Sequence, residues 1–204
     1  MADIPTLDEI KSGASQPTSP LAKALEILFE ASPVITTTLE PQVALLIQSH
    51  PPASFSELID ISLQSLSIWN MSEQAAFIAG HPRIGEVKNL SNLSAKEQGQ
   101  GTSPGVTPTP PEILARLKHL NECYEAKYPG LRYITFVNGR TRGGIAQEME
   151  DKLRLDHNLS PNEPAVSSLV PVEVDGEEWC AELKRAIKDI GYIAKSRLGA
   201  LGVQ

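Results

Sequence analysis

The sequence predicts an all-α fold: one multi-helix domain with a single short extended segment near residues 133–137. Three observations lead to this prediction. Apolar residues recur at helical spacing through most of the chain. Prolines and glycines separate the periodic stretches and mark where helices end. Only Tyr133–Val137 has the aromatic and β-branched composition of a strand, and Asn138–Gly139 turns the chain after it.

Length and composition favour one domain with an aliphatic core. A chain of 204 residues is close to the usual size of a single domain. Hydrophobic residues make up 41% of the chain but aromatic residues only 5%, so the core must consist mainly of aliphatic side chains. Residues 1–19 are polar and contain Pro5 and Pro17. We therefore expect a flexible N-terminal arm over residues 1–19, followed by a helical domain over residues 20–204.

Four helices are expected in the first half of the chain. In the first of them, Leu21, Leu25 and Leu28 recur at helical spacing, and Ser32–Pro33 ends the helix. Ser54 is a suitable N-cap for the third helix. The helical patterns cover residues 21–29, 41–48, 55–66 and 71–80.

The second half opens with a break. The stretch Gly99–Pro111 is too rich in glycine and proline for a helix or a central strand, and it is either a surface excursion or a loop folded over something. Pro110–Pro111 then open a long helix, since proline is favoured in the first helical positions, and Pro129–Gly130 end it. Helical spacing returns over residues 143–155 and 177–198, joined by a proline-bearing connection over 160–172.

Charge and cysteine usage exclude several classes of protein. Acidic residues outnumber basic ones 25 to 18, for a net charge of -7, which argues against non-specific nucleic-acid binding. No apolar run approaches the roughly 18 residues of a membrane span. Cys123 and Cys180 have no metal-binding spacing and are expected to be reduced core thiols, so no metal is predicted. No secretory signal pattern is present, so a cytoplasmic or peroxisomal protein is expected, and the sequence has no terminal Ser-Lys-Leu peroxisomal signal.

His81 is the histidine in the most constrained setting. It lies in the turn Gly80–Gly85, and Pro82 biases it toward an extended backbone. Its imidazole would be held at a helix end, either for catalysis or in a structural role. The other histidines have ordinary explanations as solvated or helix-surface groups: His50, His119 and His157.

Ser94, Glu97 and Gln98 form a second candidate group. Their spacing places the three side chains on one face of a helix. The Ser-x-x-Glu pattern is also that of a capping box, with Ser94 as the N-cap and Glu97 reaching back to its amide. The two interpretations are partly exclusive, because a glutamate that caps its own helix is poorly placed to reach a substrate.

Arg140, directly after the turn Asn138–Gly139, is the third candidate. An arginine in this position can bind a carboxylate through two parallel N–H groups. A solvated basic turn is the alternative.

The order of these motifs resembles one family. A His-Pro-x-Ile-Gly run at His81 is followed by Ser-x-x-Glu-Gln at Ser94, then by a helix with Leu-Asn-x-x-Tyr-Glu-x-Lys from Leu120, then by an extended run that ends in Gly-Arg at Arg140. The 2-oxo-4-hydroxy-4-carboxy-5-ureidoimidazoline (OHCU) decarboxylases of uric acid degradation share this order, and the resemblance covers about residues 20–200. It implies an all-α, cofactor-free carboxy-lyase, usually a homodimer, that forms (S)-allantoin from a small-molecule substrate.

The resemblance also implies site residues. His81 and Glu97 match the family's catalytic histidine and glutamate, and they should face one pocket. Either Arg140 or backbone N–H groups would bind the oxygens of the substrate. The substrate-binding residues that the resemblance implies are Pro82, Ser94, Gln98, Phe136, Asn138 and Arg140.

Two other kinds of function remain open. A non-catalytic helical binding protein could retain the family pocket, and the full set of site residues argues against it. A helical adaptor could offer the prolines of the loop over residues 99–111 to an aromatic groove of a partner. The scarcity of charge beside those prolines makes this the weaker alternative.

Overall fold

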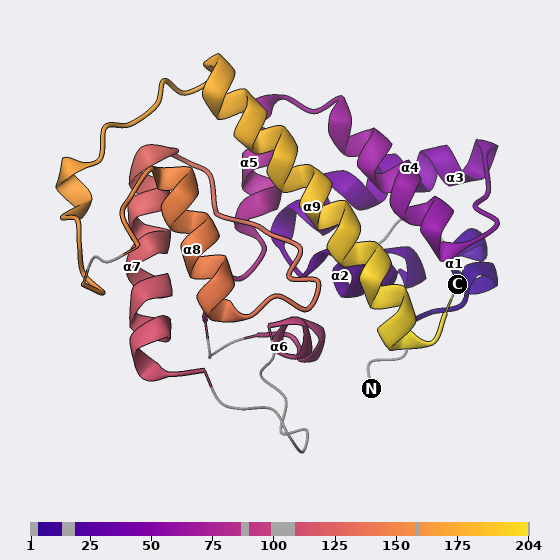
Figure 1. Cartoon of the computed structure of the whole chain (residues 1–204). Coiled ribbons are helices and arrows are strands. Elements are labelled where there is room, and N and C mark those ends of the chain that lie inside the picture. The colour runs from indigo at the N-terminus through magenta and orange to yellow at the C-terminus, as the bar shows by residue number, and fades with distance from the viewer. Residues whose placement is uncertain (1–3, 14–18, 87–89, 99–108, 158–159, 204) are drawn as a thin grey trace. The chain divides into compact units, whose positions relative to one another are not determined.

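The structure is a computed structural model that describes residues 4–13, 19–86, 90–98, 109–157 and 160–203. Within these ranges the regular elements are helices, with no strand or sheet, so the all-α prediction is confirmed (Figure 1). Residues 99–108 of the predicted proline-rich loop lie outside the described residues. The chain divides into two units, Met1–His81 with Ile187–Gln204, and Pro82–Ala186.

The first unit contains the four helices expected in the first half of the chain. Ser19, Ser54 and Asn70 each accept a hydrogen bond from the backbone amide three residues further on, which satisfies an otherwise open helix end. The elements are α1 (Leu7–Ser12), α2 (Pro20–Phe29), the π-helical turn η1 (Ile35–Leu39), α3 (Glu40–Ser49), α4 (Phe55–Ser67), α5 (Met71–Ala79) and the C-terminal part of α9 (Glu177–Leu201).

The core of the first unit is mainly aliphatic, as the composition predicts, with a small aromatic cluster. The ring of Phe77 lies 5.8 Å from that of Phe29 and 6.2 Å from that of Trp69, measured between centroids. Arg197 on α9 is also buried, and its guanidinium pairs with Glu30 and donates to carbonyls in the last turn of α2. The arginine thus satisfies carbonyls that have no partner within their own helix.

Helix α1 lies in the region expected to be a flexible arm. Thr6 and Glu9 form a capping box at its start, and the side chain of Ile10 is fully buried. Helix α1 packs on α2 within the first unit. With a single core residue in six, α1 has too short an apolar pattern to be recognised from sequence.

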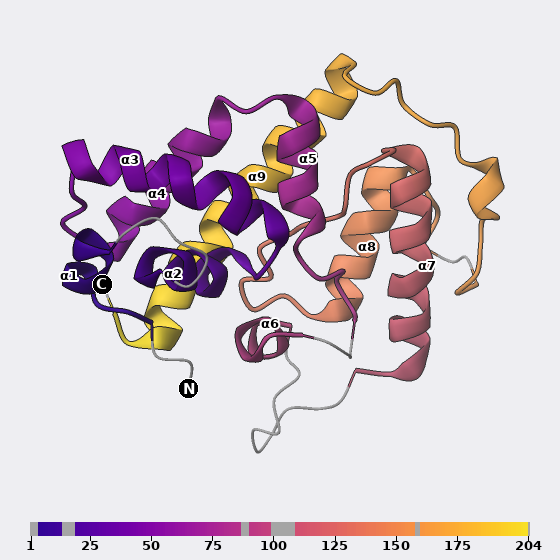
Figure 2. The ribbon, with the colours of Figure 1, turned by 180° about the vertical axis from the view of Figure 1, so that it is seen from behind.

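The second unit is built around two long helices. Helices α7 and α8 lie side by side in both views (Figures 1 and 2). A buried ion pair joins them, with Arg116 Nε 2.7 Å from Glu150 Oε1. The elements of this unit are α6 (Asn92–Glu97), α7 (Pro111–Lys127), α8 (Arg142–Leu153), the 3-10 turn η2 (Val166–Ser168) and the N-terminal part of α9.

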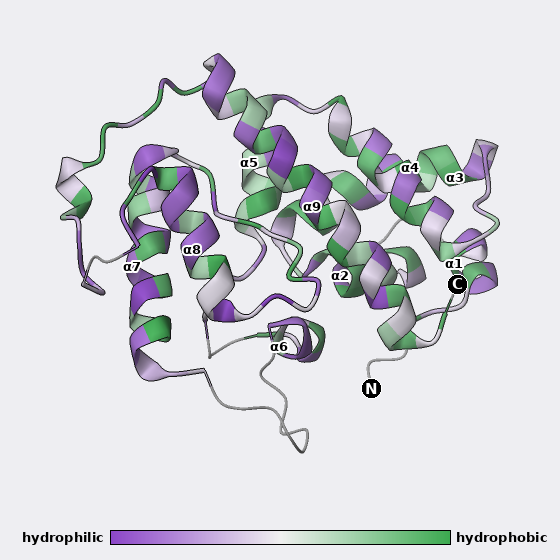
Figure 3. Ribbon diagram, in the orientation of Figure 1, coloured by the Kyte–Doolittle hydropathy of each residue, from purple (hydrophilic) through white to green (hydrophobic). Residues whose placement is uncertain are grey.

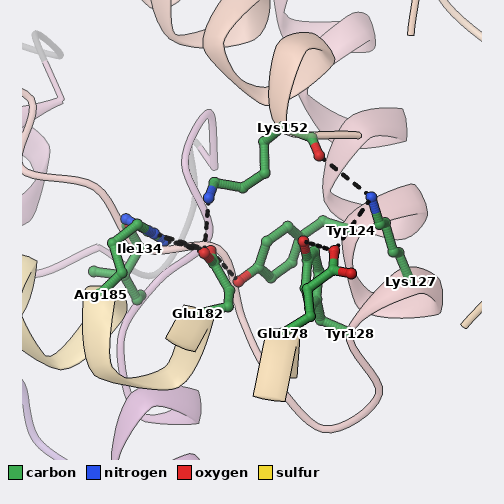
Figure 4. Close-up of polar contacts among 8 residues, drawn as sticks. All are labelled: Tyr124, Lys127, Tyr128, Ile134, Lys152, Glu178, Glu182 and Arg185. Carbon is green, nitrogen blue, oxygen red and sulfur yellow. Dashed lines mark hydrogen bonds and ion pairs between the residues drawn. The ribbon is translucent and has the colours of Figure 1, made fainter. Parts of the chain in front are cut away.

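A buried carboxylate on α9 organises the polar contacts of the second unit. Glu182 accepts hydrogen bonds from Tyr124 Oη and Lys152 Nζ, each at 2.7 Å, and pairs with Arg185 at 2.7 Å (Figure 4). Arg185 also donates to the carbonyl oxygen of Ile134 at 2.8 Å. One carboxylate therefore ties α7, α8 and α9 together and, through Arg185, fixes the segment after α7.

The segment Tyr133–Val137 has strand-like composition but forms no strand. Side chains bind carbonyls that a neighbouring strand would otherwise bind. Arg185 donates a hydrogen bond to the Ile134 carbonyl, and Arg140 donates to the carbonyls of Phe136 and Val137. The segment therefore runs across the second unit without needing a sheet partner.

Hydropathy agrees with packing along the longest helix. Purple and green patches alternate along α9 (Figure 3), as expected for a helix with one polar face and one buried stripe. None of the helices in the described part of the chain combines the length and the apolar character that a membrane crossing requires.

Candidate functional site

His81 lies one residue after Gly80, the C-cap of α5, at the helix end that the sequence predicts. The residue is only 3% exposed, its amide donates to the Ile78 carbonyl at 3.0 Å, and its ring stands edge-on to Phe77 at 5.6 Å between centroids. Gly80 permits this close turn, since a Cβ there would lie 2.8 Å from the Cβ of Ser32. The imidazole is thus held in a packed environment at the last residue of the first unit.

Helix α6 carries the second candidate group, and its N-cap is Ser91 rather than Ser94. The amide of Ser94 donates to Ser91 Oγ at 3.1 Å, so the capping box that the sequence allowed at Ser94 is not formed. Ser94 and Gln98 are buried, and Glu97 at the last helical position is half-buried. The alternative in which Glu97 caps the amide of Ser94 is therefore wrong.

Gln98 joins α6 to the turn that contains Pro82. Its Oε1 accepts a hydrogen bond from the Gly85 amide at 2.9 Å, and its Nε2 donates to the Arg83 carbonyl at 3.3 Å. Asn121 on α7 holds the same turn by donating to the Ile84 carbonyl at 3.0 Å. The structure thus brings together the Pro82 segment and the buried face of α6, two of the regions predicted for the site.

Arg140 closes the turn after the extended segment. Asn138 and Gly139 have φ of 45° and 76°, the left-handed region in which asparagine and glycine are the usual residues. The guanidinium of Arg140 pairs with Glu148 and donates to Thr135 Oγ1 at 2.9 Å and to the carbonyls of Phe136 and Val137. These contacts fix the Phe136–Asn138 backbone, and direct binding of substrate by Arg140 stays a prediction.

The structure places a residue beside this group that the sequence interpretation passed over. Arg142, the first residue of α8, is buried and donates to Gln98 Oε1 at 3.5 Å and Thr109 Oγ1 at 3.3 Å. Burial lowers the pKa of its guanidinium from the ordinary value. In sequence, Arg140-Thr141-Arg142 looks like a solvated basic turn. The available signal was Thr141 as an N-cap, which makes the next residue helical and able to face inward.

His81 and Glu97 belong to different units, so their predicted convergence on one pocket stays a prediction. The second unit also has an open pocket of about 320 Å³ near the end of α7, lined by residues such as Lys127, Arg154 and Val170. That pocket contains none of the residues predicted for the site. The described residues contain no group of three or more His, Cys, Asp or Glu side chains arranged to hold a metal ion.

Comparison with protein-family models shows to which family the chain belongs. The family model described as OHCU decarboxylase matches residues 14–163. The chain belongs to this family. The part that matches the OHCU decarboxylase model runs from before α2 to beyond α8 and includes every residue predicted for the site, as well as Arg142. A search of curated proteins found no match.

Proposed function

We propose that this protein is a cofactor-free carboxy-lyase that converts 2-oxo-4-hydroxy-4-carboxy-5-ureidoimidazoline into (S)-allantoin and CO2 in the degradation of uric acid. Membership of the OHCU decarboxylase family carries the proposal. The matched span retains His81 and Glu97, a general acid–base pair of the kind that a decarboxylation with proton transfer requires. A homodimer in the cytoplasm or the peroxisome is part of the same proposal.

The substrate supplies its own electron sink, a ring imine beside the carbon that bears the carboxylate. The bond from that carbon to the carboxylate breaks and CO2 leaves. The electron pair forms a double bond to the neighbouring ring carbon, and the imine nitrogen takes up a proton. The neighbouring carbon then receives a proton on one face while the hydroxyl loses one, which leaves a carbonyl. The enzyme has only to orient the substrate and to move protons.

His81 and Glu97 are the groups for those tasks. We assign His81 to the hydroxyl and carboxylate, where it turns the carboxylate out of the ring plane. Glu97 exchanges a proton with the hydroxyl or the ring, and the two roles could be interchanged. Glu97 is half-buried at the last position of α6, whose N-cap is Ser91, and this position is compatible with the role.

The remaining predicted residues contact the substrate. Ser94 and Gln98 come from the buried face of α6, and Pro82 from the turn that Gln98 holds. Backbone N–H groups of the Phe136–Asn138 run bind the ring and ureido oxygens, and Arg140 secures that run.

The test uses freshly generated substrate and follows the circular dichroism of the allantoin that forms. The wild-type protein should accelerate formation of the (S) enantiomer. His81→Ala and Glu97→Gln should abolish that acceleration while leaving the far-ultraviolet spectrum of the helices unchanged. His157→Ala and Glu122→Gln, both at exposed positions, are the matched controls and should retain activity. Wild-type rates in either site variant would overturn the assignment. A wild-type protein that binds allantoin without forming it would favour the non-catalytic alternative.

A further inference from the structure

The buried arginines among the described residues differ in whether a carboxylate pairs with them. Arg116 pairs with Glu150, and Arg197 pairs with Glu30. Arg142 is buried to a similar degree, at 8% exposed, but within the described part of the chain no carboxylate pairs with it. A buried guanidinium is normally paired, because leaving a charge without a counter-charge in a poorly solvated site is costly.

The contacts of Arg142 are weak for a cation. Its two Nη atoms reach the neutral acceptors Gln98 Oε1 and Thr109 Oγ1 at 3.5 and 3.3 Å. Its Nε is buried and has no hydrogen-bond partner among the described residues. In the sequence, the residues between Gln98 and Thr109 include no aspartate or glutamate. The lowered pKa of Arg142 has burial as its cause, with no acidic neighbour contributing. Arginine is not deprotonated in proteins, so the guanidinium carries its charge, and its Nε is a donor that an external anion can bind.

The position of Arg142 identifies which anion fits. It touches Gln98, which lies on the buried face of α6 with Ser94, and both are substrate-lining residues in the proposed function. A guanidinium binds a carboxylate through two parallel N–H groups, a geometry that a single buried Nε–H with a neighbouring Nη can offer. The substrate carries one carboxylate, and the product, allantoin, carries none.

We propose that Arg142 binds the carboxylate of the substrate, an inference that rests on the proposed function and adds a specificity-determining residue to it. An ion pair to the carboxylate is made in the ground state and weakens as CO2 departs. Arg142 therefore contributes to substrate binding more than to the chemical step, and its loss raises KM more than it lowers kcat. Once CO2 has left, neutral allantoin has no carboxylate for Arg142 to bind, and this favours product release.

The test combines kinetics with binding of two stable probes that both carry ureido groups. Allantoate has a carboxylate, and allantoin is neutral. By titration calorimetry, Arg142→Gln should weaken allantoate binding about 10- to 100-fold, the range for a hydrogen bond to a charged group, while allantoin affinity changes little. KM should rise over the same range with kcat nearly unchanged. Arg142→Lys, which keeps a charge but loses the planar fork, should fall between wild type and Arg142→Gln.

Controls separate this role from a structural one. If Arg142 served only to hold Gln98 and Thr109, its loss would weaken the binding of allantoin and of allantoate equally. That result would overturn the proposal. Lys118→Gln removes an exposed charge from α7 and should leave both affinities unchanged. Should Arg142→Gln not fold, Arg142→Lys and the wild-type protein still decide: no allantoate binding by folded wild type, or wild-type KM in Arg142→Lys, would overturn the inference.

The outcomes also distinguish this inference from the proposed function. A wild-type protein that forms no allantoin but binds allantoate through Arg142 would contradict the enzyme and leave the anion site standing. An active wild type together with unchanged KM and allantoate affinity in Arg142→Gln would contradict the anion site and leave the enzyme standing.

Discussion

Replacing Glu182 by glutamine should destabilise the second unit more than any comparable change on α9. The carboxylate is 5% exposed and serves Tyr124, Lys152 and Arg185 at once (Figure 4). Removing one partner of a buried charge pair costs about 3–5 kcal/mol. Because the side chains of Lys152 and Arg185 are 25% and 28% exposed, water solvates part of the charge left behind, and we expect about 2–3 kcal/mol.

Urea denaturation followed by circular dichroism measures this cost, and the melting temperature should fall by about 4–12 °C for a protein of this size. Glu178→Gln is the matched control, one helical turn earlier on α9. Its side chain is 53% exposed, accepts a hydrogen bond from Tyr128 at 3.0 Å and pairs with Lys127 at 3.8 Å, so its loss should cost less than about 1 kcal/mol. Equal costs for the two variants would refute the reasoning.

The pH dependence gives the same prediction a second test. Burial alone would raise the pKa of Glu182, but hydrogen bonds and charge from Arg185, with Lys152 and Tyr124, outweigh burial and lower it. A folded-state pKa below the unfolded value means that the stabilisation is fully present above the ordinary glutamate pKa near 4.5 and is lost as the pH falls further. The difference in unfolding free energy between wild type and Glu182→Gln should therefore shrink in acid. A difference that stays constant or grows there would contradict the assigned charge.

Two further predictions concern the turn and the helix that carry the proposed site. Gly85→Ala should cost about 1–3 kcal/mol in urea denaturation, because φ is 85° and the new Cβ would lie 3.0 Å from the Cβ of Leu117. Gly139→Ala, with φ of 76° and nothing within 4 Å of the new Cβ, isolates the backbone strain and should cost less. Gln98→Glu should give Arg142 an internal carboxylate while retaining the acceptor for the Gly85 amide. We expect a folded protein whose calorimetric affinity for allantoate is reduced at least about 10-fold, and an unchanged affinity would count against an anion site at Arg142.

The positions of the longer helices were predictable from sequence because local chemistry decides them, whereas the short α1 was not recognised. Proline and glycine stand at the ends of α2, α3 and α5, and Ser54 caps α4 as expected. The cap of α6 was not predictable in the same way. Ser91 and Ser94 lie one turn apart, both suit an N-cap, and packing of α6 against the turn around Gly85 decides between them.

The site was predictable as motifs but not as contacts. The roles of Gln98 and Arg142 depend on hydrogen bonds between residues 13 and 44 positions apart. The behaviour of Tyr133–Val137 depends on Arg185, which lies on a different helix and replaces the strand partner that composition alone suggests. Long-range contacts of this kind leave no periodic signal in the sequence.

Arg140 and Arg142 illustrate how burial separates two residues that sequence treats alike. They flank the N-cap Thr141, and neither is favoured there, because the N-terminus of a helix carries partial positive charge. Arg140 lies outside the helix, is exposed and pairs with Glu148 of α8, so its charge is balanced and it serves the 135–137 backbone. Arg142 adds a buried cation to the positive end of α8, and its hydrogen-bond partners among the described residues, Gln98 and Thr109, carry no carboxylate. A bound anion would relieve an arrangement that is unfavourable on both counts, and this is why we propose that Arg142 binds the carboxylate that the substrate loses in the reaction.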